Sequence, residues 1–331
     1  PKHPNISVLE VVLTKLHSGA KLRGEYGVSG GLHGIGLKAL TALAENLEVE
    51  VRRGDGNAST LTFVNGIKQG KIQTTPLKKG DYQSGTAISW RLSKKFLPDA
   101  SSLLVSKETV RRMLRERSYM NAGLQLTLKW EDEKLERFLE HDGLAAFALE
   151  LAGEKTLFAK AAHFTGASDT EVPVEVAITW TSGYGRDNLQ GFCNCVRQPE
   201  GGTHLQGLRM SLPQVIRAYI EENGILSAKD KGLKIEGADC FEGVHALVAV
   251  RHRNPVFKGQ AKTSIANTDI QGAVQKAVNA GLAQWLEENP KEAKVLAQRA
   301  VAAAKARVAA SKAREQVRKQ DAGTFGMKNF G

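Results

Sequence analysis

A glycine-rich stretch between two helical patterns restricts the fold of this chain more than any other feature. Apolar residues recur at helical spacing over residues 7–17, where Ser7 and Glu10 have the spacing of a capping box. A second helical pattern covers residues 38–47. Between them, residues 29–36 read SGGLHGIG. Glycines let the backbone approach a ligand closely, and the N–H groups at the start of the following helix suit a polyphosphate.

The spacing of these glycines argues against two common phosphate-binding folds. The pattern Gly31-x-x-Gly34-x-Gly36 is neither the Rossmann spacing nor a Walker A sequence, which needs Gly-Lys-Ser/Thr. The element before it is a helix, whereas both of those motifs follow a strand. The residues alone leave a second interpretation open, in which the glycines only permit a tight entry into the helix.

The remaining patterns predict two domains of mixed helix and strand. A chain of 331 residues is too long for one ordinary core, because domains usually hold about 100–200 residues. Residues 154–172 are loosely patterned, which places the domain boundary near residue 155. Before it we expect neighbouring antiparallel strands at residues 47–53, 59–65 and 85–92, a helix after Ser106, a strand at residues 123–130 and a helix at residues 142–152.

The pattern after the boundary is again mixed, and it ends in a long helix. A Pro-bearing loop at residues 253–264 precedes helical sequence that starts at Asp269 and breaks at Asn289-Pro290. The final helix is rich in Ala, Lys and Arg, so we expect a long and mostly solvated rod. The earlier elements are predicted to be strands at residues 175–181 and 244–252 and a helix at residues 211–223.

Charge and composition indicate the kind of partner and compartment. The chain carries 46 Lys and Arg against 35 Asp and Glu, a net charge of +11, which favours nucleic acid or nucleotide phosphate as a partner. No run approaches the roughly 20 apolar residues of a membrane span, so we expect a soluble, cytoplasmic protein without membrane contact. The first ten residues carry no targeting signature, which suggests a start within a longer protein. Buried or incidental thiols are expected at Cys193, Cys195 and Cys240, which lack zinc-site spacing.

Four segments, in the same order, resemble the B subunits of type II DNA topoisomerases, the family of DNA gyrase B and the topoisomerase IV ATPase subunit. Residues 21–43 (KLRGEYGVSGGLHGIGLKALTAL) are similar to the family's nucleotide lid and glycine box. Residues 85–90 (GTAISW) resemble a strand near the adenine. Residues 188–212 (NLQGFCNCVRQPEGGTHLQGLRMSL) resemble the start of the transducer domain. Residues 254–267 (NPVFKGQAKTSIAN) resemble the loop that reaches back to the neighbouring ATP site.

This resemblance covers essentially the whole chain and implies roles for individual residues. Gln260 and Lys262 would contact the γ-phosphate; Ala261 departs from the family's Gln-Thr-Lys triplet, but the lysine supplies the charge. Thr86 would lie near the adenine. The residues implied to hold the triphosphate are Lys21 and Tyr26 of the lid and Gly30, Gly31, Leu32, His33, Gly34, Ile35 and Gly36 of the glycine box.

Basic residues in the last helix are candidates for contacting DNA. The Lys and Arg residues of this helix meet few acids in the sequence, which suits a surface that faces phosphates. A solvated helix face is an equally good interpretation of the same pattern. The four candidates are Lys305, Arg307, Lys312 and Arg314.

The resemblance implies a fold of the α/β (α+β) class. Residues 1–155 would form an incomplete Bergerat-type ATPase α/β sandwich, with a mixed sheet under helices. Residues 156–331 would form a smaller transducer domain with a crossover helix and a long basic C-terminal helix.

The implied function is the use of ATP and Mg²⁺ to gate the passage of DNA. In this family ATP binding closes a homodimeric gate around DNA and hydrolysis reopens it, while a partner A subunit carries the cleaving tyrosine. The family's water-activating glutamate, its metal-holding asparagine and its Asp-Gly-Arg-Gly segment have no match here, so we expect the chain alone to be hydrolytically inactive. Two alternatives remain: an ATPase of mismatch-repair or chaperone type, against which residues 201–205 argue, and a hydrolysis-deficient scaffold.

Overall fold

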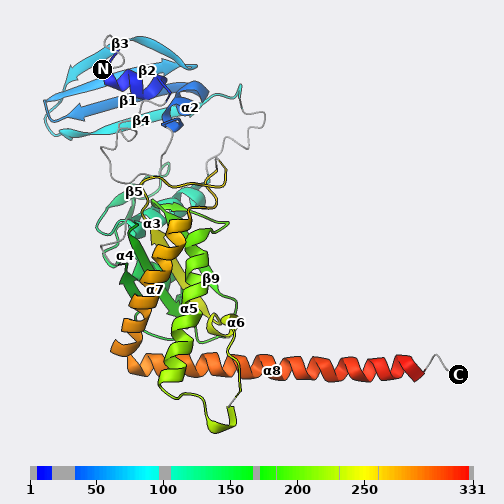
Figure 1. Cartoon of the computed structure of the whole chain (residues 1–331). Coiled ribbons are helices and arrows are strands. Elements are labelled where there is room, and N and C mark those ends of the chain that lie inside the picture. The colour runs from blue at the N-terminus through cyan, green and yellow to red at the C-terminus, as the bar shows by residue number, and fades with distance from the viewer. Residues whose placement is uncertain are drawn as a thin grey trace. The chain divides into compact units, whose positions relative to one another are not determined.

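The chain folds into two compact units. The computed structural model describes residues 6–16, 34–96, 106–166, 172–183, 185–230, 232–259 and 261–327, with side chains described as far as residue 319 (Figure 1). The N-terminal unit comprises Pro1–Arg112 and the C-terminal unit comprises Met113–Gly331. Two units are also what the sequence analysis predicts. The division after Arg112 lies about forty residues before the expected boundary near residue 155. The reason lies in helix α4 (Gly143–Ala152), which packs onto the sheet of the C-terminal unit.

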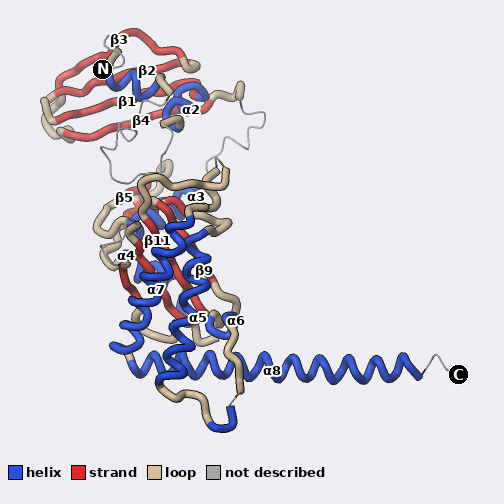
Figure 2. The backbone as a smooth tube through the Cα atoms, viewed as in Figure 1, coloured by secondary structure: helices blue, strands red, loops and turns tan. Residues whose placement is uncertain are grey.

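The sheet of the N-terminal unit has four strands in the order β3-β2-β1-β4 (Figure 2). Every pairing within it is antiparallel, so the expected mixed sheet is wrong for the described strands. Short turns explain this, because a turn such as Asn65-Gly66, with φ of 49° and 77°, returns the chain beside the strand it has just left. The strands are β1 (Ala44–Arg53), β2 (Asn57–Val64), β3 (Ile67–Pro76) and β4 (Ser84–Leu92).

Strand β3 was not expected from the sequence. Its residues are almost all exposed, so it lacks the alternation of apolar and polar side chains that marks a half-buried strand. Lys68 on this strand pairs through its Nζ with a carboxyl oxygen of Glu10 at 2.8 Å. Glu10 therefore links helix α1 (Val8–Thr14) to the sheet edge. Its backbone N–H donates to Ser7 Oγ at 3.1 Å, as the capping pattern predicts.

Two helices contribute to the core of the N-terminal unit. They are α1 (Val8–Thr14) and α2 (Gly36–Leu43). Leu13 of α1 is buried with Leu47, Val49, Leu61 and Phe63 of the sheet. The expected helix over residues 38–47 is too long, because the backbone turns extended at Ala44 and Leu47 is a buried strand residue. Leucines at a spacing of three and four residues fit both a helix and the start of a buried strand.

The C-terminal unit is built on a five-stranded sheet in the order β10-β9-β11-β8-β7. Strands β9 and β11 are parallel, and helix α5 (Thr203–Glu222) lies on the connection between them, so the expected crossover helix is confirmed. This unit is the larger of the two, contrary to expectation. The strands are β7 (Ala162–Thr165), β8 (Val174–Trp180), β9 (Asn188–Cys193), β10 (Val196–Arg197) and β11 (Val244–Val250).

Helices cover both faces of this sheet. Helices α5 and α7 (Thr268–Glu288) pack on one face, with Leu208, Leu212 and Val274 in the larger core. Helix α4 (Gly143–Ala152) packs on the other, where Phe147 stacks on Tyr119 at 4.7 Å between ring centroids. The smaller elements are α3 (Lys107–Met120), β5 (Leu126–Leu128), β6 (Glu136–Phe138), η3 (Gly153–Lys155), η4 (Ala228–Asp230) and α6 (Gly237–Cys240).

The last helix, α8 (Pro290–Met327), has two different halves. The break before it at Asn289-Pro290 is confirmed. Leu296, Ala300 and Ala304 are buried in the core, so the first half is not solvated as expected. Residues 309–319 are exposed, and the expected solvated rod describes only this part.

Two helical glycines provide a matched test of the packing between α5 and α7. A methyl group on Gly207 would lie 2.8 Å from the backbone oxygen of Gln271, whereas one on Gly272 would meet nothing within 4 Å. We predict that Gly207→Ala lowers the free energy of unfolding by about 1–3 kcal/mol through overpacking. Gly272→Ala should raise it by about 0.5–1 kcal/mol, because alanine favours the helix. Urea denaturation of both variants measures this, and equal midpoints would contradict the packing.

Candidate functional site

The described part of the glycine box forms the entry to helix α2. Gly34 has a φ of 57°, Ile35 is the N-cap residue and Gly36 begins the helix. The N-cap makes no side-chain hydrogen bond, the first turn holds no acidic residue, and a methyl group on Gly36 would meet nothing within 4 Å. An open helix start of this kind fits an anionic ligand. The remaining candidates of this segment lie outside the described residues: Lys21, Tyr26, Gly30, Gly31, Leu32 and His33.

A buried lysine in the same helix turn was not singled out from the sequence. Lys38 is only 8% exposed, and burial lowers the pKa of its amino group. An anion nearby would offset this desolvation, so the residue adds to the suitability of this turn for phosphate. Sequence offers little signal for it, because a lysine on a short helix is normally solvated.

Thr86 lies on β4, where it is paired in register with Val51 of β1. Cross-strand partners point to the same face of a sheet, and the next such pair, Val49 and Ile88, belongs to the core under the helices. Thr86 therefore shares the helix-covered face of the sheet, and its side chain is exposed. The structure thus places Thr86 and the helix that follows the glycine box on one side of the same sheet.

Lys262 lies in the loop between β11 and α7, in the C-terminal unit. Lys258 N donates to Ser264 O at 2.8 Å, and Phe257 forms a β-bridge with Ile265, so the two sides of the loop are pinned together. Lys262 itself has a φ of 56°, and its Nζ lies 5.8 Å from the centroid of the Phe257 ring. Gln260 lies outside the described residues.

The Gly-Gly-Thr-His segment supports this loop. Glu200 N donates to Thr263 O at 3.0 Å, and Gly202 forms a β-bridge with Ile265. Gly202 has a φ of 144°, and a methyl group there would overlap the Ile265 backbone, so only glycine fits. Helix α5 then begins at Thr203, eight residues before the expected start. The earlier start of the helix could not be predicted, because two glycines followed by a threonine are as typical of a loop as of the start of a helix.

His204 is a buried structural residue. Its ring is fully buried, and a methyl group on Gly191 of β9 would overlap it. Burial lowers the pKa of His204 to about 4, although the carbonyl groups of Gly202 and Gly191 oppose the shift. Neither ring nitrogen has a hydrogen-bond partner of good geometry. The histidine is therefore neutral at pH 7 and serves to pack α5 against β9.

The four candidate DNA-contacting residues divide into two groups. Lys305 Nζ pairs with Asp230 at 2.9 Å. Arg307 pairs with Asp239 at 2.9 Å and with Glu236 at 3.0 Å. These two residues hold α8 against the segment before β11, and the acids that they meet lie about seventy residues away in sequence. Lys312 and Arg314 remain exposed.

The described cysteines and acidic groups form no metal centre. Cys193 and Cys240 are buried, as predicted, and burial raises the pKa of each thiol to about 12. Cys195 is half-buried. Within the part of the chain that the structure describes, no group of three or more His, Cys, Asp or Glu residues could hold a metal ion. The described helices include none that is long and apolar enough to cross a bilayer.

Solved structures that resemble this chain include ATPase regions of type II topoisomerases. The chain is similar to the 43K ATPase domain of Thermus thermophilus gyrase B, solved with an aminocoumarin, with 31% identity and a TM-score of 0.75 over 93% of this chain and 77% of that one. It is similar to the topoisomerase IV ATP-binding domain of Francisella tularensis, with 25% identity and a TM-score of 0.71 over 93% of this chain and 79% of that one. The fold and these similarities define the ATP-binding region of a type II topoisomerase B subunit.

Comparison of the sequence with known protein families identifies the family to which the chain belongs. The profile of the family described as DNA gyrase B matches residues 143–316. The DNA gyrase B protein of Clostridium acetobutylicum is 35% identical over 94% of this chain and 48% of its own length. The chain belongs to the DNA gyrase B family, and it spans about half the length of most of the curated relatives it matches. Membership of this family sets aside the mismatch-repair and chaperone alternatives.

The buried state of His204 predicts a pH dependence of stability. Its pKa in the folded protein, about 4, lies below the value near 6.5 in the unfolded chain, so the unfolded state binds more protons between these values. This contribution to stability is complete above pH 6.5 and is lost as the pH falls towards 4. Its size is roughly 3 kcal/mol, at about 1.4 kcal/mol per pKa unit.

Denaturation of the wild type and of His204→Asn between pH 7 and pH 4 measures this contribution. The wild type should lose stability more steeply than the variant, while His141→Asn, at an exposed position, should follow the wild type. Parallel curves for the wild type and His204→Asn would show that the histidine titrates normally.

Proposed function

We propose that this chain is the ATP-binding and coupling region of a type II topoisomerase B subunit, in which ATP-driven dimerisation gates the passage of DNA. The observation that carries the proposal is the pinned loop that presents Lys262, held by Gly202 and Ile265 at the start of the crossover helix. The similarity to gyrase B and topoisomerase IV ATPase structures supports it. The N-terminal unit corresponds to an incomplete Bergerat-type ATPase domain and the C-terminal unit to the transducer.

The nucleotide is assigned to the helix-covered face of the N-terminal sheet. The open start of α2 at Gly34–Gly36 and the buried Lys38 suit a triphosphate, and Thr86 shares the same sheet face for the adenine. Lys21, Tyr26 and residues 29–33 complete the phosphate contacts in this proposal. Bound ATP supplies the phosphoryl group, and Mg²⁺ neutralises part of its charge.

The γ-phosphate is assigned to Lys262 and Gln260. A lysine on a pinned loop offers a cation at low entropic cost, because the backbone hydrogen bonds of Lys258 and Glu200 already fix the loop. A further backbone hydrogen bond, from Thr203 N at the start of α5 to Ile265 O at 3.2 Å, joins the loop to α5. A contact made by Lys262 would therefore bear directly on the crossover helix, which is how nucleotide state would reach the transducer.

The partners in this proposal are DNA, a topoisomerase A subunit and a second copy of the chain. Lys312 and Arg314 are the exposed candidates for DNA phosphate contacts, whereas Lys305 and Arg307 hold α8 in place. The free thiols suit a reducing, cytoplasmic compartment.

Replacement of Lys262 in the complete subunit tests the nucleotide assignment. We predict that Lys262→Ala keeps measurable ATP binding but lowers ATP turnover by roughly 10²-fold, as expected for loss of a charged transition-state contact. Lys258→Ala is the matched control, because it removes an exposed lysine from the same loop and should leave turnover near the wild-type value. Unchanged turnover in Lys262→Ala would remove this lysine from the site.

The hydrolysis-deficient scaffold is distinguished from the proposal by ATP binding. Under both alternatives the 331-residue chain should not hydrolyse ATP, because the family's water-activating glutamate has no match in it. A complete subunit that also binds no ATP by calorimetry would favour the scaffold over the proposal.

A further inference from the structure

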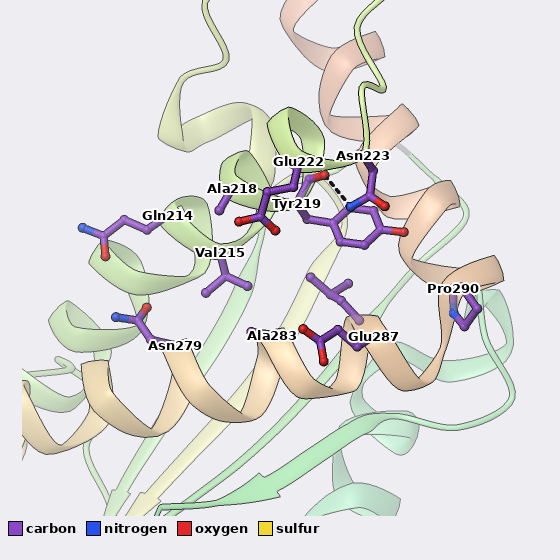
Figure 3. A pocket seen from close by; sticks show the side chains of 11 residues that line it. Gln214, Val215, Ala218, Tyr219, Glu222, Asn223, Asn279, Ala283, Glu287 and Pro290 are labelled. Atoms are coloured by element: carbon purple, nitrogen blue, oxygen red, sulfur yellow. Dashed lines mark hydrogen bonds between the residues drawn. The ribbon is translucent and has the colours of Figure 1, made fainter.

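A groove lies between the C-terminal ends of α5 and α7, within the C-terminal unit (Figure 3). Its volume is about 710 Å³, which falls in the range of sites for small organic ligands. The residues that line it belong to α5 and its C-cap residue Asn223, to α7, and to the first position of α8. None of them belongs to the proposed nucleotide or DNA contacts.

The two helices run parallel and place their negative ends at this groove. Gly207 near the start of α5 adjoins Gln271 near the start of α7, and Glu222 and Glu287 at their ends line the same groove. Each helix end carries about half a negative charge from its backbone dipoles. Neither last turn contains a basic residue; both end in paired glutamates, at residues 221–222 and 287–288. This is unfavourable for the isolated helices, and it concentrates negative potential in a chain of net charge +11.

Two carboxyl groups face the groove from opposite walls. Figure 3 shows the side chains of Glu222 on α5 and Glu287 on α7 on either side of the space between the helices. Neither glutamate forms an ion pair with a residue that the structure describes. In contrast, Glu288 outside the groove accepts a hydrogen bond from Gln284 Nε2 at 2.8 Å.

The floor of the groove is apolar, which bears on the kind of cation that fits. It is formed by Val215, Ala218, Ala283 and Leu286. A metal ion in a protein prefers a shell of several oxygen ligands that includes charged groups, and the charged ligands of this lining are Glu222 and Glu287. The other polar side chains that line the groove are neutral: Gln214, Tyr219, Asn223 and Asn279. An organic ammonium with an aliphatic body matches both features, because its charge pairs with carboxylates and its methylene groups cover apolar surface.

We propose that this groove binds an aliphatic diamine or polyamine. Its ammonium groups would pair with the carboxylates of Glu222 and Glu287, and its methylene chain would lie over Val215 and Ala218. The site lies apart from the α2 turn and from Lys262, so the proposal does not depend on the nucleotide assignment.

Titration of the 331-residue chain with 1,5-diaminopentane, followed by two-dimensional NMR, tests the proposal. The expected result is saturable binding with shifts centred on the lining residues of α5 and α7. Glu222→Gln with Glu287→Gln should weaken binding at least about tenfold, because two charge-assisted hydrogen bonds are lost. The matched control, Glu221→Gln with Glu288→Gln, removes the same charge from the same helix ends but outside the groove, and should weaken binding only about twofold.

A second variant tests the apolar floor without changing charge. Ala218 is exposed, so Ala218→Leu should fold normally while filling part of the groove, and should weaken binding of the diamine. Ammonium chloride at the same concentration should give no saturable shifts, because it lacks the methylene chain. Equal losses in the two glutamate pairs, unaffected binding in Ala218→Leu, or no saturation in the wild type would each overturn the proposal.

Discussion

The close contact between α5 and its neighbours is the interaction on which the C-terminal unit depends. Three glycines make it possible: Gly191 receives the His204 ring, Gly202 adjoins Ile265, and Gly207 adjoins α7. Each removes a side chain at a point where two backbones or a ring must approach closely. One helix is thereby fitted at once to the sheet, to the loop that holds Lys262 and to the helix beside it. A change at any of the three contacts therefore acts on a helix that also makes the other two.

A group of buried polar side chains accompanies this contact. Gln198, Thr203 and His204 lie within seven residues of one another, are nearly or fully buried, and lack hydrogen-bond partners for several of their polar atoms. Such groups cost stability, and they commonly mark ordered water or a functional strain. They lie between β9 and the Lys262 loop, and in the proposed function this is the part of the molecule that would change its contacts with the state of the nucleotide.

Much of the fold could be predicted from sequence where local signals were strong. The break at Asn289-Pro290, the N-cap at Ser7 and the apolar strand β11 follow from local chemistry alone. The elements that were predicted wrongly share a physical cause, because tertiary contacts and not the local sequence determine their secondary structure. The spacing of Leu47 from the preceding leucines fits either a helix or a buried strand. The exposed strand β3 lacks the alternation of apolar and polar residues that would indicate a strand.

The prediction of the candidate site rests on the order of its motifs in the sequence. No spacing rule links residues of the glycine box to Lys262, which belongs to the other unit. The burial of Lys38 and the ion pairs of Arg307 could not be predicted, because the sequence does not distinguish a buried or paired lysine or arginine from a solvated one.

The anchoring of α8 at Arg307 has a mechanical consequence. Arg307 is the last residue of α8 with a described ion pair to the body of the unit, and the helix continues as far as Met327. Twenty residues of helix extend about 30 Å at 1.5 Å per residue. A tilt of about 10° at Arg307 would move the far end by roughly 5 Å, so the helix acts as a lever that enlarges small shifts. Asp239 and Glu236 form the fulcrum, and the stiffness of their contacts with Arg307 sets how faithfully a movement of the core reaches the far end of the helix.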